Sequence, residues 1–193
     1  MMRRLLNVVP GLALALGGFF ALAGFACTNQ DTTATKASDA APDFTGKGDD
    51  GKTYTLASLT EGGKTLVLYF VKNGCGANPT AVPLFKKMSA AFLKSDKVNF
   101  VVVFNDEKPA FDEFKKEFGV EFRALLDPKH EIIHAYKAKH SQGSAIVRDG
   151  KILKHWQGFS RSSLTETGET MAAATGTKFD VDLSDAPATE SFG

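Results

Sequence analysis

Cysteine is scarce in this sequence, whose 193 residues contain only Cys27 and Cys75. A domain stapled by disulfides needs several cysteines, so this chain must rely on a hydrophobic core. A charge excess is also absent, since 23 lysines and arginines stand against 22 aspartates and glutamates. Proteins that bind nucleic acid through its phosphates carry a clear basic excess, and we therefore expect no nucleic-acid partner.

Long uncharged runs are confined to the first 26 residues. After Met1-Met2-Arg3-Arg4, the stretch LLNVVPGLALALGGFFALAGFA (5–26) continues without a charge. A basic start followed by an apolar run is typical of a secretory signal peptide. The run is long enough to span a bilayer, but Pro10 and several glycines make it a poor permanent helix. We expect residues 1–26 to be a signal peptide and the protein to be exported.

Cys27 directly follows this run, with the small residues Gly24 and Ala26 before it. The arrangement resembles a bacterial lipoprotein signal, in which a lipid is attached to the cysteine that becomes the new N-terminus. Leu22 to Gly24 would complete that motif if a cysteine came next, but two residues intervene. We expect lipidation of Cys27 and membrane attachment in the cell envelope. A cleaved periplasmic protein and an uncleaved anchor are the alternatives.

The remaining chain divides by composition into three parts. Residues 27–41 are small and polar without apolar periodicity, which predicts a flexible tether. Residues 42–176 are long enough for one domain with one core. Residues 177–193 are acidic and weakly patterned, and we expect them to form a peripheral C-terminal tail.

The apolar patterns in the domain alternate between two periods. Continuous apolar runs predict buried strands, while apolar residues at helical spacing predict amphipathic helices. Strands are expected at 64–71, 98–105 and 122–126, helices at 79–95, 109–118, 127–137 and 160–174, and a hairpin at 144–156 across Asp149-Gly150. This order predicts an α/β domain of three layers, with a mixed sheet between helices.

These elements and their landmarks resemble the thioredoxin fold and, within it, the redoxin or alkyl-hydroperoxide-reductase/thiol-specific-antioxidant (AhpC/TSA) family. The landmarks are APDFTGKGDDGKTYTLASL (41–59), the apolar run that leads into Cys75, Pro83 eight residues later, LLDPKHEI and IVRDGKI. The resemblance implies that a buried strand delivers Cys75 to a helix N-terminus and that Pro83 kinks that helix. It also implies thiol–disulfide or peroxide-reducing antioxidant chemistry, with no cofactor.

The chain departs from the family pattern at three positions around Cys75. Asn78 stands where a thioredoxin-like site has its second cysteine, and Lys72 stands where a peroxiredoxin site has threonine or serine. Ser141, preceded by His140, stands where these folds carry a cis-proline. Without a second cysteine, an oxidised Cys75 would need an external thiol reductant or a partner thiol protein.

We therefore interpret Cys75 as a single reactive thiol with four supporting residues. Lys72 and His140 could stabilise the thiolate by charge, while Asn78 and Ser141 could donate hydrogen bonds to the sulfur. Because the residue before a proline disfavours the α region, we expect Asn78 to be the N-cap, with Cys75 three residues earlier. The alternative is a redox-inactive binding module on the same fold, in which Cys75 is a small apolar residue.

A second motif, His130-Glu131-x-x-His134, has the spacing of a zinc metallopeptidase. His140 falls where some of these enzymes have a third ligand, but Lys137 replaces the glycine that would turn the chain back. The family resemblance instead implies a surface helix with Ile132, Ile133 and Tyr136 facing inward. We expect His130 and His134 to face solvent and no metal to be bound for catalysis.

Overall fold

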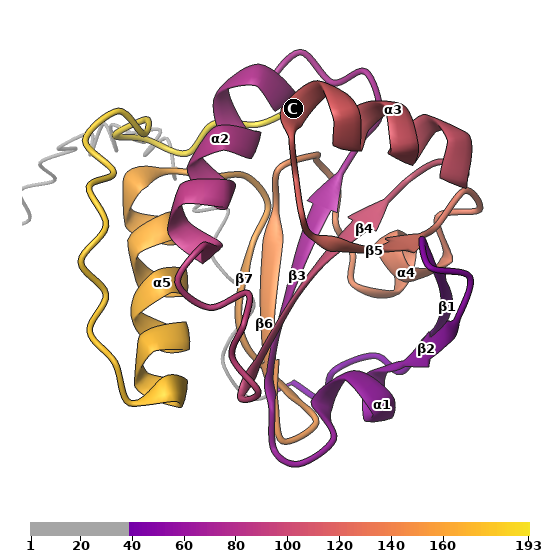
Figure 1. The fold of residues 1–193 in the computed structure, drawn as a ribbon, viewed down its shortest axis with the longest axis horizontal. Coiled ribbons are helices and arrows are strands. Elements are labelled where there is room, and N and C mark those ends of the chain that lie inside the picture. The colour runs from indigo at the N-terminus through magenta and orange to yellow at the C-terminus, as the bar shows by residue number, and fades with distance from the viewer. Residues whose placement is uncertain (1–38) are drawn as a thin grey trace, which may run out of the picture. The chain divides into compact units, whose positions relative to one another are not determined.

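A computed structural model describes residues 39–193, so the expected signal peptide and Cys27 lie outside the described part. Seven strands and five helices follow one another along the chain (Figure 1). They are β1 (Thr45–Gly48), β2 (Thr53–Thr55), α1 (Leu56–Thr60), β3 (Thr65–Val71), α2 (Asn78–Ser89), β4 (Val98–Phe104), α3 (Lys108–Phe118), β5 (Arg123–Leu126), α4 (Glu131–Ala135), β6 (Ser144–Arg148), β7 (Lys151–Trp156) and α5 (Arg161–Thr175).

The strands form one mixed sheet in the order β2-β1-β5-β4-β3-β6-β7. β3, β4 and β5 are parallel, whereas β6 pairs antiparallel with β3 and β7 continues the hairpin. All seven residues of β3 are buried, as its continuous apolar sequence predicts for a central strand covered on both faces. The α/β fold expected from the sequence, a thioredoxin-like sheet between two helical layers, is confirmed.

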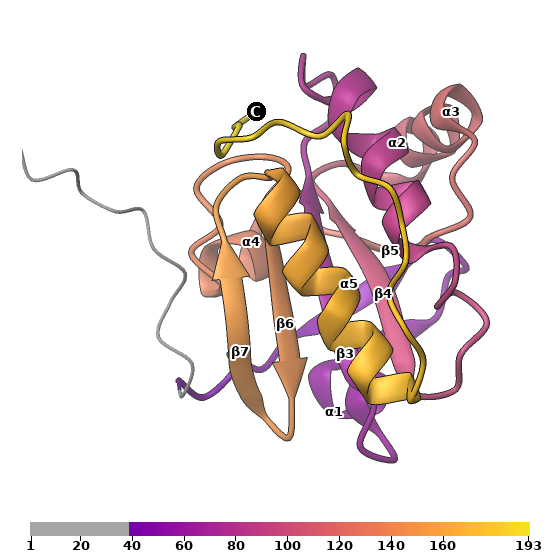
Figure 2. The same cartoon turned by 90° about the vertical axis from the view of Figure 1, so that its left-hand side faces the viewer.

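Alternate residues of β3 enter two separate hydrophobic cores. Val67, Tyr69 and Val71 pack with buried residues of α2, α3 and α5. Leu66, Leu68 and Phe70 pack on the other face with buried residues of α1 and α4. Figure 2 shows α5 and α2 together over one face of the sheet. This two-sided burial holds the end of β3, and therefore the start of the next loop, in a fixed position.

Most element ends follow the local signals in the sequence. Gly119 ends α3 in the left-handed region at φ 55°, and Asp149 and Gly150 have the positive φ angles of a tight hairpin. α2 is shorter than the predicted helix at 79–95, because it ends at Ser89. α4 is also shorter than the predicted 127–137. Asp127 does not cap it directly but accepts from the Ile133 N–H at 2.9 Å across the preceding turn.

Residues 177–193 are not peripheral, contrary to the expectation. Figures 1 and 2 show this yellow segment running back beside α5 towards the end of the molecule where β3 leads into α2. Leu183 and Ala186 are buried in the core under α2 and α5. The Arg161 side chain donates to three carbonyl oxygens of the segment, at residues 183, 184 and 186. The sequence of this segment does not indicate these contacts, because only a few of its residues are apolar.

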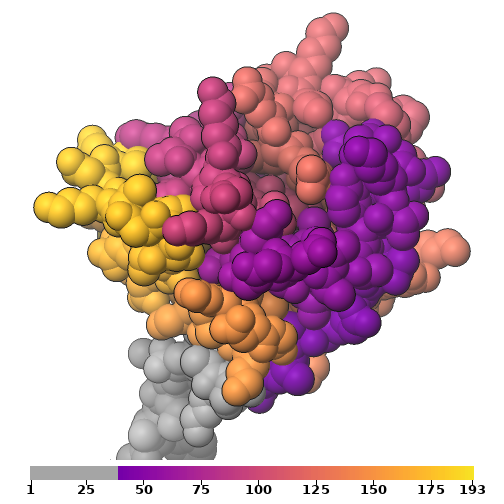
Figure 3. All heavy atoms as spheres, turned by 60° about the horizontal axis from the view of Figure 1, so that its bottom comes forward, coloured from indigo at the N-terminus to yellow at the C-terminus, as the bar shows by residue number. Residues whose placement is uncertain are grey.

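The first described residues belong to the sheet edge rather than to the tether predicted at 27–41. Ala40 forms a bridge with Lys151, and the Ala41 N–H donates to the Gly150 carbonyl at 2.9 Å. Figure 3 shows the surface made by β1, β2 and α1, in indigo to purple, with the orange β6–β7 turn beside it. Among residues 39–193, no helix has the length and apolar character needed to cross a membrane.

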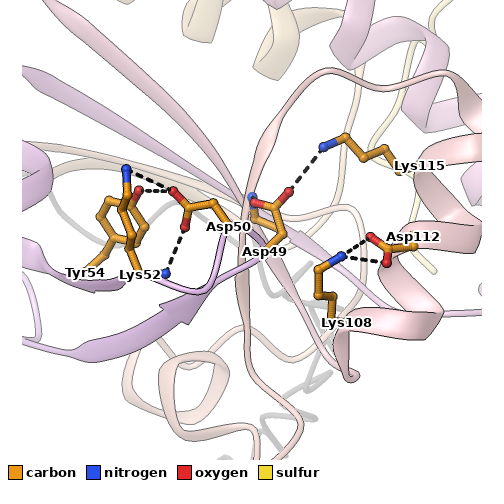
Figure 4. Close-up of polar contacts among 8 residues, drawn as sticks. Asp49, Asp50, Lys52, Tyr54, Lys108, Asp112 and Lys115 are labelled. Atoms are coloured by element: carbon orange, nitrogen blue, oxygen red, sulfur yellow. Dashed lines mark hydrogen bonds and ion pairs between the residues drawn. The ribbon is translucent and has the colours of Figure 1, made fainter.

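Polar contacts fasten the β1–β2 turn to α3 and β5 (Figure 4). One oxygen of Asp49 lies 3.2 Å from the Lys115 Nζ, and its other oxygen accepts from the buried Ala124 N–H at 3.0 Å. By contrast, Lys108 and Asp112 pair along the exposed face of α3 at 2.6 Å. The Asp49 carboxylate thus connects two elements, whereas the Lys108–Asp112 pair stays within one helix.

Candidate functional site

Cys75 lies in the loop between β3 and α2. Its N–H donates to the Lys72 carbonyl at 3.3 Å, and its own carbonyl accepts from the Asn78 N–H at 3.0 Å. The thiol is half-buried, and it is the one free cysteine of residues 39–193. The Ala77 N–H donates to the sulfur at 3.4 Å. The Ala77 N–H therefore directs the positive end of its dipole at the sulfur.

The start of α2 differs by one residue from the expectation. The helix begins at Asn78, and Ala77 is the N-cap without a side-chain hydrogen bond. Cys75 therefore precedes the cap by two residues rather than three, which places its sulfur on the Ala77 N–H. Pro79 lies in the first turn, where backbone N–H groups have no partner within the helix, so its missing N–H costs no hydrogen bond. Pro83 lies inside the helix, as the family pattern implies.

Asn78 points away from the sulfur and into a buried polar network. Its amide donates to the Lys72 carbonyl at 3.1 Å, and its oxygen accepts from the Gln142 amide at 2.5 Å. The Gln142 amide also donates to the Ser141 hydroxyl at 2.9 Å, and Tyr69 donates its hydroxyl proton to the Gln142 oxygen. This network joins the end of β3, the start of α2 and the loop before β6 directly below the thiol.

Ser141 closes the network on its other side. Its hydroxyl accepts from the Lys72 N–H at 2.9 Å, and its backbone N–H donates to the Gly193 carbonyl at 3.2 Å. The Ser141 N–H is thus used by Gly193, and its hydroxyl accepts from Lys72 and Gln142; donation of the hydroxyl proton to the sulfur stays a prediction. The position of Ser141 beside Cys75 does agree with the expectation. A Cβ placed on Gly193 would overlap the Cys75 Sγ and lie 3.2 Å from the Ser141 Cβ.

Tyr69, like Gln142, is a residue of this site that the sequence reasoning missed. Its side chain is fully buried, and burial raises its pKa well above the usual value; the charge of a nearby Cys75 thiolate raises that pKa further. Tyr69 therefore stays neutral and donates to Gln142. A tyrosine inside an otherwise apolar strand was the available signal, since a buried hydroxyl needs a partner.

The two predicted cations lie at the edge of the site. The Lys72 side chain is exposed, although its backbone belongs to the network. The His140 ring is exposed too and packs on the Phe192 ring, with centroids 5.0 Å apart. The His140 ring thus packs on the C-terminal segment. Its proposed role as a base or cation for Cys75 stays a prediction.

The His130-Glu131-x-x-His134 motif does not form a zincin helix. His130 has φ 60° and precedes α4, which has only five residues, so the two imidazoles do not lie one regular turn apart. Their ring centroids are 5.8 Å apart. Among residues 39–193, no group of three or more His, Cys, Asp or Glu side chains is arranged to hold a metal ion.

His134 is exposed as expected, whereas His130 is half-buried. Both line a cavity of about 570 Å³ that also reaches Lys72, His140 and Ser141. This cavity has an apolar floor of residues such as Phe70 and Ile133.

Comparison with known proteins agrees with this arrangement. A family model described as the AhpC/TSA family matches residues 37–156. No match is found among curated proteins. A putative thiol:disulfide interchange protein DsbE from Chlorobium tepidum is 28% identical to this chain, with a TM-score of 0.63. The match covers 74% of this chain and 99% of the DsbE chain.

Two further solved structures share the fold at lower identity. A putative protein disulfide isomerase from Bacteroides thetaiotaomicron is 22% identical, with a TM-score of 0.65 over 75% of this chain and 93% of its own. The bacterioferritin comigratory protein of Xanthomonas campestris, described for its alkyl peroxide reduction, is 18% identical, with a TM-score of 0.58 over 70% of this chain and 98% of its own. These two matches show the shared fold.

Proposed function

Since this chain belongs to the AhpC/TSA family, we propose that it is a thiol oxidoreductase of the cell envelope that works through the single cysteine Cys75. The observation that carries the proposal is the sulfur position at the end of β3, where it accepts the Ala77 N–H beside the start of α2. The thiolate is the reactive form of cysteine, and a sulfur that is half-buried rather than enclosed can meet another thiol or a peroxide. The DsbE protein to which this chain is similar is described as a thiol:disulfide interchange protein, which supports thiol exchange here.

The chemistry needs an external thiol, because residues 39–193 contain no second cysteine. In exchange, the Cys75 thiolate attacks one sulfur of a partner disulfide; a mixed disulfide forms and the other sulfur leaves as a thiolate. A second partner thiolate then attacks the mixed disulfide and releases Cys75. With a peroxide, the thiolate attacks one oxygen, the O–O bond breaks, and an alcohol or water leaves after taking up a proton. The sulfenic acid on Cys75 is then reduced by two external thiols with loss of water.

Intact-mass measurement of the native protein tests this function. After treatment with peroxide or a glutathione disulfide, we expect a sulfenic acid or a mixed disulfide on Cys75 and its removal by added thiol. Cys75→Ser is the control that should show neither product, and Cys27→Ser should keep both. A Cys75 that gains neither group while alkylation shows it to be accessible would identify a redox-inactive binding module instead.

We further propose that residues 1–26 direct export and that a lipid on Cys27 anchors the domain. The support is the basic and apolar N-terminal pattern together with Gly24, Ala26 and Cys27. Membrane fractionation of expressing cells tests this. The wild-type protein should need detergent for release, and Cys27→Ser should appear in the aqueous fraction or stay unprocessed. Equal release of both proteins without detergent would indicate a cleaved protein that carries no lipid.

A further inference from the structure

The last residues of the chain lie on Cys75 as a short strand. The Ser141 N–H donates to the Gly193 carbonyl at 3.2 Å, and the Gly193 N–H donates back to the Ser141 carbonyl at 3.3 Å. Two residues that exchange both backbone hydrogen bonds form the hydrogen-bonded pair of antiparallel strands. The loop before β6 therefore acts as a strand edge, and residues 190–193, the covering segment, are paired with it.

A second pair of hydrogen bonds fixes the register of this segment. The Phe159 N–H donates to the Ser191 carbonyl at 2.9 Å, and the Ser191 N–H donates to the Phe159 carbonyl at 2.8 Å. The Glu190 carboxylate also accepts from the Gly158 N–H at 3.0 Å. A Cβ on Gly158 would overlap the Ser191 carbonyl, so glycine is needed there for the close approach.

The side chains of the segment match the surface below it. Gly193 lies over the sulfur, where a Cβ would overlap the Cys75 Sγ and approach the Ala77 Cβ to 3.3 Å. Phe192 packs on the His140 ring yet remains 42% exposed. A residue without a side chain over the thiol, preceded by an aromatic residue against His140, is the pattern that fits this site.

Ser141 makes this pairing stronger than a proline at the same position would. A proline has no N–H, so only its carbonyl could bond an incoming strand. Ser141 supplies both groups and uses both on Gly193. Serine in place of proline at position 141 therefore adds a backbone N–H donor for a bound polypeptide.

An exposed link joins the covering segment to the buried part of the tail. Leu183 and Ala186 hold the preceding chain in the core, whereas Ala188 and Thr189 are exposed and form the link to residues 190–193. Exposed links with few buried contacts open at low free-energy cost. Residues 183–186 thus attach the tail to the core, whereas residues 190–193 cover the thiol.

We infer that Ser141, His140 and the surface over Cys75 form a binding site for an extended polypeptide, and that residues 190–193 occupy this site within the same molecule. An incoming protein partner pairs with Ser141 only after it has displaced them. The preferred polypeptide has a glycine over the sulfur and an aromatic residue just before it. The inference rests on the proposed function for the identity of the partner, a protein thiol or disulfide.

The test compares the alkylation rate of Cys75 in the native protein and in variants, all carrying Cys27→Ser. Deletion of residues 190–193, and separately Phe192→Ala, should speed alkylation by a bulky maleimide roughly tenfold, the ratio that corresponds to about 1.4 kcal/mol. Leu93→Ala is the matched control, because Leu93 is also an exposed large apolar side chain, 37% exposed, but lies outside the segment. Its rate should equal that of the parent protein.

A peptide with the sequence of residues 188–193, ATESFG, provides the second arm. Added to the deletion variant, it should slow alkylation again, while ATESAG should protect much less. Equal rates for the parent, the deletion and Phe192→Ala, or no protection by either peptide, would overturn the inference. Faster alkylation of the deletion variant without any sulfenic acid or mixed disulfide would instead leave the binding site standing and remove the proposed redox function.

Discussion

At the scale of single residues, the buried network below Cys75 depends on Gln142. This residue has no exposed surface and a positive φ of 71°, and it contacts Tyr69, Asn78 and Ser141. Its side chain thus takes both a donor and an acceptor role between the three elements around the thiol. A buried side-chain amide that is hydrogen-bonded to all of its polar neighbours holds them in one arrangement. Removing one partner leaves a buried donor or acceptor without a hydrogen bond.

We predict that Tyr69→Phe lowers the free energy of unfolding by about 1–3 kcal/mol, because the buried Gln142 oxygen loses its donor. Tyr136→Phe is the matched control. Within residues 39–193 the buried Tyr136 hydroxyl has no hydrogen-bond partner, so its loss should not destabilise the protein. Urea unfolding of the two variants measures the difference. Equal effects from both would show that the network contributes nothing to stability.

His155 gives the second prediction at this scale. It lies buried on β7 against the Phe70 ring, and burial lowers its pKa below the usual value of 6.5. The unfolded chain therefore takes up a proton at a higher pH than the folded protein does. Stability contributed by neutral His155 is present above about pH 6.5 and is lost as the pH falls towards the lower folded pKa.

Unfolding measured between pH 7.5 and about pH 5 should accordingly show a stability slope that His155→Gln reduces. His134→Gln, a change at an exposed histidine, should leave the slope as it is. A slope shared unchanged by all three proteins would assign the pH dependence to other groups.

At the scale of elements, the Asp49 carboxylate connects the β1–β2 turn to α3 and β5 (Figure 4). We predict that Asp49→Ala costs about 1–3 kcal/mol, because the buried Ala124 N–H loses its acceptor. Lys115→Ala should cost less than about 1 kcal/mol, since its ammonium is partly solvated. Asp112→Ala, within the exposed Lys108 pair, is the control and should cost about 0.3–0.5 kcal/mol. A loss for Asp49→Ala no larger than for Asp112→Ala would contradict this assignment.

The sequence predicted most elements because their signals are local. The run at 64–71 reads as buried on both faces, and Gly119 and Asp149-Gly150 mark their turns. The bounds of α2 and α4 were missed, and at α4 Asp127 bonds the Ile133 N–H from the preceding turn instead of standing at the N-cap. The site was predicted in position but not in bonding. Ser141 lies beside Cys75 as expected, yet the hydrogen bonds of Ser141 and Asn78 go to groups that sequence spacing does not indicate.

At the scale of the whole molecule, the C-terminal tail belongs to the core over one part of its length. Leu183 and Ala186 are buried with α2 and α5, whereas Phe192 is largely exposed at the thiol. A weakly apolar segment of this kind gives no periodic signal. Its burial depends on Arg161, whose guanidinium meets carbonyl oxygens that follow it by more than twenty residues.

We predict that Leu183→Ala lowers stability by about 2–5 kcal/mol, the usual cost of a cavity in a packed core. Phe192→Ala should lower it by no more than about 1.4 kcal/mol, the value that corresponds to tenfold weaker docking of residues 190–193, because its side chain is 42% exposed. Thermal or urea unfolding of both variants checks the pair. A small effect of Leu183→Ala would mean that residues 177–193 lie on the surface after all.

The full burial of β3 also sets how the backbone exchanges its amide hydrogens with water. Its residues pair with β4 on one side and β6 on the other, so their amides become accessible only when the whole domain unfolds. The loop of residues 72–77 begins at the next residue and is largely exposed. Cys75 therefore lies four residues beyond the part of the chain that we expect to exchange most slowly. Opening of that loop would leave the sheet that supports it closed.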